Sequence, residues 1–168
     1  MPDGRRKNTN RKGYLTMLNE GDKAPSFTIP TDQGHFSLDE QTGMTVVFFF
    51  PKADTSGCTA EAIAFSQHKS AFDALGVSVI GISKDKPQKQ GKFREKHELT
   101  CGLGADDSSD ISEQFGVWVE KSMYGRKYMG IARATFLIDA NGIIKKVWPK
   151  VKVNGHADEV LATVKAMA

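Results

Sequence analysis

The sequence predicts a single α/β domain built around a mixed β-sheet. Short apolar runs typical of buried strands alternate with amphipathic helical patterns through the first two thirds of the 168 residues. Two further strand-like runs joined by a hairpin signal follow, and a helix closes the chain. Alternating strands and helices indicate parallel pairing, whereas a hairpin indicates antiparallel pairing, so the sheet should contain both.

The composition suits one hydrophobic core, with 39% hydrophobic and 26% charged residues. No apolar run approaches the roughly 20 residues that a membrane helix needs, so no bilayer span is expected. The net charge is +3, but residues 1–13 carry +4 from five basic residues and one aspartate, which leaves −1 for the rest. We therefore predict a basic, disordered tail over residues 1–16, one domain over residues 17–168 and no nucleic-acid partner.

The first elements are expected to form a small β-hairpin, in which residues 24–29 and 34–38 flank a turn. The first central strand spans Thr45 to Phe50, because this run is short, β-branched and aromatic. Pro51 ends the strand by removing a backbone donor. From Cys58 to Leu75 apolar residues recur at helical spacing, which predicts one amphipathic helix.

The second half continues the alternation. Residues 77–82 form a second apolar run, and Pro87 suits the first turn of a helix that extends to Glu98. A weak strand over residues 100–105 and a short helix over residues 109–115 follow. The sequence then predicts two strands around an Asn-Gly turn and a final helix, at residues 133–139, 142–147 and 158–167.

The segment between the first central strand and the first helix is suited to a reactive thiol. Asp54, Thr55 and Ser56 are turn and N-cap residues, so Cys58 falls in or near the first helical turn. Unpaired N–H groups, including those of Gly57 and Cys58, and the positive end of the helix dipole favour a thiolate there. Lowering an ordinary cysteine pKa from about 8.5 to about 6 needs roughly 3 kcal/mol. Since a helix N-terminus supplies at most about 2 kcal/mol, a nearby cation is also expected.

The residues around Cys58 resemble the active-site signature of the peroxiredoxins, which reduce peroxides with a thiol. Pro51 to Cys58 fits the pattern Pro-x-x-x-Thr-x-x-Cys, and the fuller string from Phe49 to Ala62 resembles the bacterioferritin comigratory protein, or PrxQ, subfamily. Residues 130–139 and 147–160 resemble the same subfamily in the same order. The resemblance implies a thioredoxin-like fold with three α/β/α layers, a monomer, and no metal or organic cofactor.

The same resemblance implies roles for individual residues. Cys58 would be the peroxidatic nucleophile, and Arg133 would hold both the sulfur and a peroxide oxygen. Thr55 would donate its hydroxyl toward the peroxide or the thiolate, and Pro51 would shield the sulfur. Glu61 also matches the subfamily, and it is either a supporting residue behind these groups or a solvated helix residue.

How the oxidised thiol is reduced again is left open by the sequence. Many members of the subfamily carry a second cysteine five residues after the first, but Ile63 occupies that position. The other cysteine, Cys101, follows the helix predicted over residues 87–98. Cys101 either attacks the sulfenic acid after local unfolding or is an inert buried thiol, and we favour the second because its register does not match the family.

We therefore predict a cytoplasmic thiol peroxidase that reduces hydrogen peroxide and organic hydroperoxides and is reduced by thioredoxin or another thiol. Two cysteines without a stretch typical of a signal peptide indicate cytosolic redox chemistry rather than a disulfide framework. The alternative is a redox-sensing or chaperone-like interaction protein in which oxidation of Cys58 changes the conformation. A cysteine hydrolase is disfavoured because no pattern sets a histidine beside Cys58.

The remaining large side chains of the C-terminal half have no motif of their own. We expect them to line the core or the wall of the pocket; they are Trp118, Tyr124, Tyr128, Met129 and Trp148.

Overall fold

The computed structural model describes residues 16–167, so the predicted basic tail lies almost entirely outside the described residues. The elements in chain order are β1 (Thr28–Thr31), β2 (Gly34–Ser37), η1 (Leu38–Glu40), β3 (Thr45–Phe49), α1 (Ser56–Gln67), α2 (Lys69–Ala74), β4 (Ser78–Ser83), α3 (Pro87–His97), β5 (Gly102–Ala105), α4 (Ile111–Gln114), β6 (Trp118–Met123), β7 (Arg126–Ile131), β8 (Ala134–Ile138), β9 (Ile144–Trp148) and α5 (His156–Met167).

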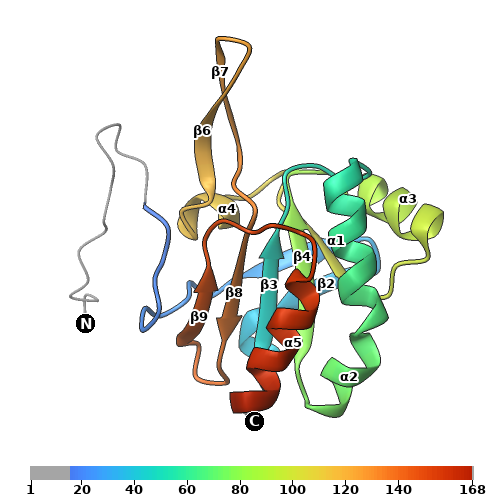
Figure 1. Cartoon of the computed structure of the whole chain (residues 1–168), viewed down its shortest axis with the longest axis vertical. Coiled ribbons are helices and arrows are strands. Elements are labelled where there is room, and N and C mark those ends of the chain that lie inside the picture. The colour runs from blue at the N-terminus through green and yellow to red at the C-terminus, as the bar shows by residue number, and fades with distance from the viewer. Residues whose placement is uncertain (1–15, 168) are drawn as a thin grey trace.

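Seven of these strands form one sheet in the order β2-β1-β5-β4-β3-β8-β9 (Figure 1). The strands β3, β4 and β5 pair in parallel, whereas β3 pairs antiparallel with β8 and β8 with β9. The prediction of a mixed sheet is thus confirmed. None of the helices in the described range is long and apolar enough to cross a membrane.

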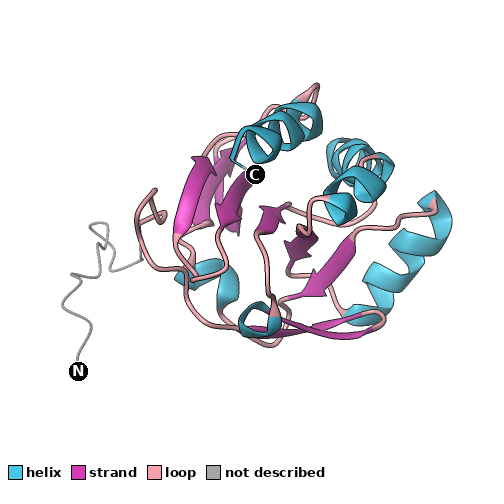
Figure 2. Ribbon diagram, turned by 90° about the horizontal axis from the view of Figure 1, so that it is seen from below, coloured by secondary structure: helices cyan, strands magenta, loops and turns pink. Residues whose placement is uncertain are grey.

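The central strand β3 determines where the first helix lies. All five of its residues are buried, because alternate side chains enter cores on opposite faces of the sheet. Phe48 faces the core shared with α1, α2, α3 and α5, where its ring stacks on Phe65 of α1 with centroids 4.5 Å apart. Phe49 faces the other core, which α4 and the N-terminal segment cover. Figure 2 shows the strands as a central layer with helices on either side.

The single helix predicted from Cys58 to Leu75 is wrong, because the structure has two helices separated at His68. The backbone of His68 leaves the helical region, with ψ near 4°. Its N–H group donates to the carbonyl of Phe65 at 3.2 Å, and its ring lies 2.5 Å from the Asp158 carboxylate of α5. A contact made 90 residues away in sequence thus accompanies this break, and helical spacing alone could not indicate it.

The hairpin formed by β6 and β7 was not predicted. Figure 1 shows it extending away from the main sheet. Its turn places Tyr124 and Gly125 at positive φ, 52° and 77°, as two-residue hairpin turns require. The expectation that Tyr124 and Tyr128 line a core or pocket is wrong, since they are 98% and 43% exposed. Trp148 is buried as expected.

Candidate active site

Cys58 lies in the first turn of α1, directly after the loop that follows β3. Its side chain is buried, with only 1% of the residue exposed. The N-cap residue Thr55 has extended backbone geometry, and its carbonyl accepts the N–H of Thr59 at 2.8 Å. The N–H groups ahead of Thr59 have no acceptor within the helix, so the thiol lies at the positive end of the helix dipole.

Arg133, in the short link between β7 and β8, bridges the thiol and a carboxylate. Its Nη2 donates to Cys58 Sγ at 3.4 Å, and its Nη1 donates to Glu61 Oε1 at 2.8 Å. The side chain is only 19% exposed, so little water competes for these contacts. The structure therefore brings together the nucleophile and the cation that the sequence predicted, from positions 75 residues apart.

Gly57 makes room for this arrangement. A Cβ atom at Gly57 would lie 3.1 Å from Arg133 Nη2, which is closer than most contacts of real Cβ atoms. The missing side chain thus lets the guanidinium lie over the first turn of α1. The role predicted for the Gly57 N–H group, binding an anion or peroxide, stays a prediction.

Glu61 is a buried member of the site, so its interpretation as a solvated helix residue is wrong. It is 1% exposed, one helical turn after Cys58. Burial raises its pKa to about 7, although the attraction of Arg133 opposes the rise. Within the described part of the chain its Oε2 atom has no hydrogen-bond partner. Glu61 therefore positions the guanidinium of Arg133 through its hydrogen bond to Nη1. Its raised pKa means that its charge changes near neutral pH.

Replacing Glu61 with glutamine should change how stability depends on pH. Below about pH 4.5 the carboxyl is protonated in both states and contributes nothing. Between pH 4.5 and 7 only the unfolded state releases the proton, so the free energy of unfolding falls as pH rises, by about 3 kcal/mol in total. Glutamine cannot ionise, so Glu61→Gln should lose this fall.

The measurement is urea denaturation at pH 5 and pH 8. We expect the drop in unfolding free energy between these pH values to be smaller in Glu61→Gln by about 2 kcal/mol. Glu95→Gln, on the exposed side of α3, is the matched control and should keep the wild-type drop. An identical pH dependence in Glu61→Gln and wild type would contradict the prediction.

Thr55 and Pro51 are at the predicted positions, but the Thr55 hydroxyl does not contact the Cys58 thiol. The Thr55 hydroxyl donates to the carbonyl of Lys52 at 2.8 Å rather than to Cys58. Its lone pairs remain able to accept a hydrogen bond from a peroxide, so its role toward substrate stays a prediction. Pro51 follows the end of the central strand as expected, and its shielding of the sulfur is likewise untested.

One partly buried cation of the β6–β7 hairpin was missed by sequence reasoning. Lys121, on β6, donates from Nζ to the carbonyl of Ile131 at 2.5 Å. Burial lowers its pKa and Arg133 lowers it further, while the negative charge of the Cys58 thiolate acts in the opposite direction. No sequence signal places this lysine, because its position depends on the unpredicted hairpin.

The loop before Cys58 is held by charged side chains from the neighbouring elements. Asp54 has an unusual positive φ of 63°, and its carboxylate accepts from Lys96 at 2.9 Å and His97 at 2.8 Å. The N–H of Ala53 donates to Asp85 at 2.8 Å. These contacts tie the loop to both ends of α3.

Cys101 packs against α1 at Ala62 and Ser66, which lie after the first turn that carries Cys58. Its Sγ is 3.8 Å from the carbonyl oxygen of Ala62, and its N–H donates to Ser66 Oγ at 3.2 Å. Both cysteines are free and buried, and burial raises the pKa of Cys101. A thiol with a raised pKa is a poor nucleophile in the folded state.

No histidine serves Cys58 as a base within the described residues. The buried histidine, His156, hydrogen-bonds Thr135 Oγ1 at 2.8 Å. Burial lowers its pKa to about 4, so it is neutral. Residues 16–167 also contain no group of three or more His, Cys, Asp or Glu residues arranged to hold a metal ion.

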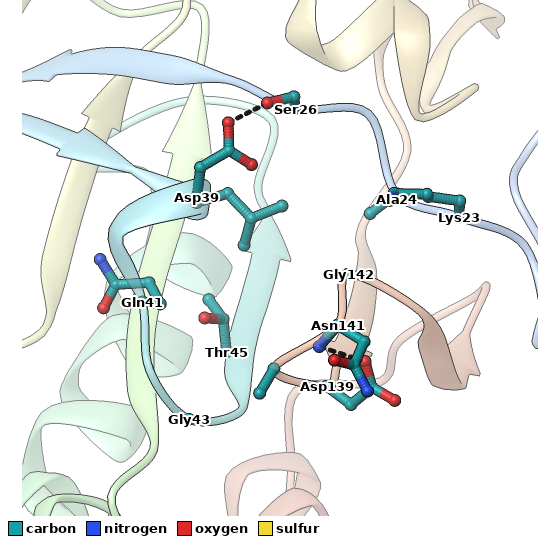
Figure 3. Close-up of a pocket in the computed structure, with 12 residues that line it drawn as sticks. Lys23, Ala24, Ser26, Asp39, Gln41, Gly43, Thr45, Asp139, Asn141 and Gly142 are labelled. Carbon is teal, nitrogen blue, oxygen red and sulfur yellow. Dashed lines mark hydrogen bonds between the residues drawn. The ribbon is translucent and has the colours of Figure 1, made fainter. Parts of the chain in front are cut away.

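Figure 3 shows a small pocket beside the start of β3 and the β8–β9 turn. Cys58 follows the opposite end of β3. The pocket measures about 130 Å³ and is formed by residues before β3 and around the β8–β9 turn, including Gly43, Asp139 and Asn141. The Asp139 carboxylate accepts the N–H of Asn141 at 2.9 Å, so it stabilises its own turn. None of the predicted site residues lines this pocket.

Comparison with known proteins identifies the family of the chain. A model of the AhpC/TSA family matches residues 20–147. The chain is 49% identical over 143 residues to a putative peroxiredoxin bcp of Coxiella burnetii, covering 84% of this chain and 95% of the relative. It is 43% identical over 150 residues to peroxiredoxin Bcp of Bacillus subtilis, covering 88% and 96%.

Solved structures of peroxiredoxins are also similar to this chain. The bacterioferritin comigratory protein of Xanthomonas campestris, studied for its alkyl peroxide reduction activity, is 34% identical with a TM-score of 0.79, covering 84% of this chain and 91% of that one. A cysteine-to-serine variant of PrxQ from Xylella fastidiosa is 31% identical with a TM-score of 0.84, covering 90% and 98%.

Proposed function

Because the chain belongs to the AhpC/TSA family and is a thiol-dependent peroxidase of the peroxiredoxin type, we propose that Cys58 is its peroxidatic residue. The observation that carries this assignment is the pair of hydrogen bonds from Arg133 to Cys58 Sγ and to Glu61 Oε1. A cation held beside a thiol at a helix N-terminus favours the thiolate, which is the reactive form.

The reaction begins when the Cys58 thiolate attacks one oxygen of the peroxide. An S–O bond forms as the O–O bond breaks, so the sulfur becomes a sulfenic acid and the departing oxygen leaves as water or an alcohol after taking a proton. The guanidinium of Arg133 donates to the sulfur and to the oxygen that develops negative charge. The N–H groups of Gly57 and Cys58, and the hydroxyl of Thr55, are proposed to orient the peroxide.

An external thiol then completes the cycle. It attacks the sulfenic acid, water leaves, and a mixed disulfide forms that a second thiol reduces. We propose hydrogen peroxide and organic hydroperoxides as substrates, since the Xanthomonas relative was studied for alkyl peroxide reduction. Thioredoxin or another thiol is the proposed reductant. We also propose a cytoplasmic location, and a monomer by resemblance to the PrxQ subfamily.

Repeated turnover tests this function against the alternative of a redox sensor. Peroxide consumption is followed with excess dithiothreitol, or with thioredoxin and its reductase, at a small amount of protein. Many equivalents of peroxide consumed per protein support the peroxidase. Consumption that stops after one equivalent, while the thiol is still present, would favour the sensor.

Replacing Cys101 with serine should leave most of the turnover with dithiothreitol. The reason is that Cys101 is buried against α1 with a raised pKa, whereas a small thiol can attack the sulfenic acid directly. The measurement is the steady-state rate of peroxide consumption, with peptide masses of the peroxide-treated wild type under non-reducing conditions as a second readout.

A quantitative Cys58 to Cys101 disulfide in the wild type would contradict this prediction. So would loss of thioredoxin-dependent turnover in Cys101→Ser. Either result would mean that the start of α1 or the segment before Cys101 unfolds in each cycle, because the two thiols are not in contact in this structure.

A further inference from the structure

We propose that Asp85 is a positioning residue for peroxide reduction, which acts through the backbone of the loop before Cys58. Its carboxylate fixes the N–H group of Ala53, five residues before the thiol. This inference rests on the proposed function of Cys58 as the reacting thiol. It assigns a role to the segment between β4 and α3, which lies outside the three sequence segments with family resemblance.

The first observation is the contact between Asp85 and the loop. Asp85 Oδ2 accepts the N–H of Ala53 at 2.8 Å, across 32 residues of sequence. Ala53 is buried, with 2% of the residue exposed. A buried N–H group without an acceptor is unfavourable, so the loop cannot leave this position without replacing the bond. Asp85 therefore determines where the chain runs after β3.

The second observation is the support behind Asp85. The side-chain amide of Gln90, which is fully buried, donates to the carbonyl of Gly104 at 2.9 Å and to Ser83 Oγ at 2.8 Å. A carbonyl oxygen can only accept, so the nitrogen of Gln90 faces both partners, and the Ser83 oxygen is an acceptor as well. The Ser83 hydroxyl is then left to donate to Asp85 Oδ2 at 2.6 Å. The carboxylate is thus held by a chain of hydrogen bonds that starts at β5.

The third observation is that no cation of the described residues competes for this carboxylate. Within residues 16–167 Asp85 forms no ion pair, although the preceding residue is a lysine. That residue, Lys84, pairs with Asp106 at 3.3 Å and with Glu113 at 2.6 Å instead. The Oδ2 atom of Asp85 therefore serves the loop and its own support alone.

The fourth observation connects this contact to Cys58. Ala53 is followed by Asp54, whose φ of 63° is unfavourable for a residue with a side chain. Such a backbone conformation persists only where the surrounding structure fixes it. The Thr55 hydroxyl then donates to the carbonyl of Lys52 at 2.8 Å, which closes the turn, and Thr55 is the N-cap of α1. The position of Ala53 therefore determines, through this closed turn, where the first turn of α1 places Cys58.

The geometry of this first turn matters more for peroxide than for other reagents. Peroxide reduction needs the sulfur, the guanidinium of Arg133 and the N–H groups of the helix start to meet one O–O bond at once. Alkylation by iodoacetamide needs only the ionised sulfur and access to it. Loss of the Asp85 contact should therefore slow the first reaction and not the second. Removal of a negative charge cannot itself reduce the thiolate, since it favours the anion.

The test measures both reactions of Cys58 in the Cys101→Ser background, where only one thiol reports. Asp85→Ala removes the acceptor, whereas Asp85→Asn keeps an oxygen that can accept from Ala53. Ser83→Ala keeps the acceptor but removes its support. The readouts are the rate of thiol loss after hydrogen peroxide is added and the rate of alkylation by iodoacetamide.

Asp139→Ala is the matched control. This carboxylate likewise accepts N–H groups of a loop, from Asn141 and Ile143 at 2.9 Å. The β8–β9 turn that it holds lies beside the start of β3, whereas Cys58 follows the end of β3. The control should lower the temperature of unfolding and leave both rates of Cys58 unchanged.

Asp85→Ala should react with hydrogen peroxide at least about tenfold more slowly than the parent, because a small displacement of the reacting groups has a large effect on the rate. Ser83→Ala should show a smaller loss in the same reaction. Asp85→Asn should stay within about twofold of the parent, because its oxygen still accepts. The rate of alkylation should equal that of the parent or exceed it in all three variants.

A parent-like peroxide rate in Asp85→Ala and Ser83→Ala would overturn the proposal. So would an equal loss of rate in Asp139→Ala, or an Asp85→Asn variant as slow as Asp85→Ala, because an acceptor would then be present without effect. Near-UV circular dichroism shows whether each variant is folded, and Ser83→Ala alone decides the outcome if Asp85→Ala is not.

The parent protein separates this inference from the function on which it rests. A parent that reacts with peroxide no faster than free cysteine would overturn the proposed function of Cys58. A parent that reacts fast, with variants that react equally fast, would overturn only the role of Asp85.

Discussion

Replacing Cys58 with serine should abolish peroxide turnover, with a loss of a thousandfold or more. A serine hydroxyl stays protonated at neutral pH. Its oxygen also cannot accept an oxygen atom from a peroxide, as the sulfur of Cys58 does when it becomes a sulfenic acid. The fold should survive, because serine is slightly smaller and Arg133 can still donate to its oxygen. The measurement is peroxide consumption with dithiothreitol, together with near-UV circular dichroism.

The matched control is the same substitution at the other buried cysteine, Cys101→Ser, which should remain active. Retention of most of the activity in Cys58→Ser would remove the basis of the assignment. In that case the contact between Arg133 and Cys58 would be structural only.

Replacing Arg133 with lysine should slow peroxide reduction by at least tenfold, equivalent to about 1.4 kcal/mol of transition-state stabilisation. Lysine keeps the positive charge but not the planar fork that donates at once to Glu61 Oε1 and Cys58 Sγ. The single ammonium group must then serve the buried carboxylate, the thiolate and the peroxide together. The rate constant with hydrogen peroxide and the pH profile of thiol alkylation both measure this loss.

Arg126→Lys is the matched control, because Arg126 lies exposed at the start of β7 and should tolerate the same change. A wild-type rate and an unchanged alkylation profile in Arg133→Lys would show that positive charge alone suffices at this position. The bridging geometry would then have no part in the chemistry.

The main features of the fold and the position of Cys58 could be predicted because their signals are local. The strand β3, its proline and the N-cap residues before α1 are contiguous in sequence, and they place the thiol in the first helical turn. Arg133 has no such signal. It was indicated only by resemblance, since it reaches Cys58 across 75 residues.

The parts that could not be predicted depend on contacts between distant segments. The helical pattern counted Glu61 among polar residues, but Arg133 allows a buried carboxylate at that position. Lys121 was missed and the tyrosines of the hairpin were misjudged for a related reason. The strands β6 and β7 are partly exposed and lack the alternation of a half-buried strand, so their pairing left no clear pattern.

The ion pairs of Asp54 bring together the two ends of the loop that a disulfide between Cys58 and Cys101 would close. Asp54 stands four residues before Cys58, and His97 stands four residues before Cys101. The contact between Asp54 and His97 therefore holds together the two chain segments that lead to the cysteines. A disulfide stabilises mainly by restricting a loop whose ends are otherwise free in the unfolded chain. The folded state has already closed this loop without a covalent bond, which leaves the local rearrangement around α1 as the main cost of joining the sulfurs.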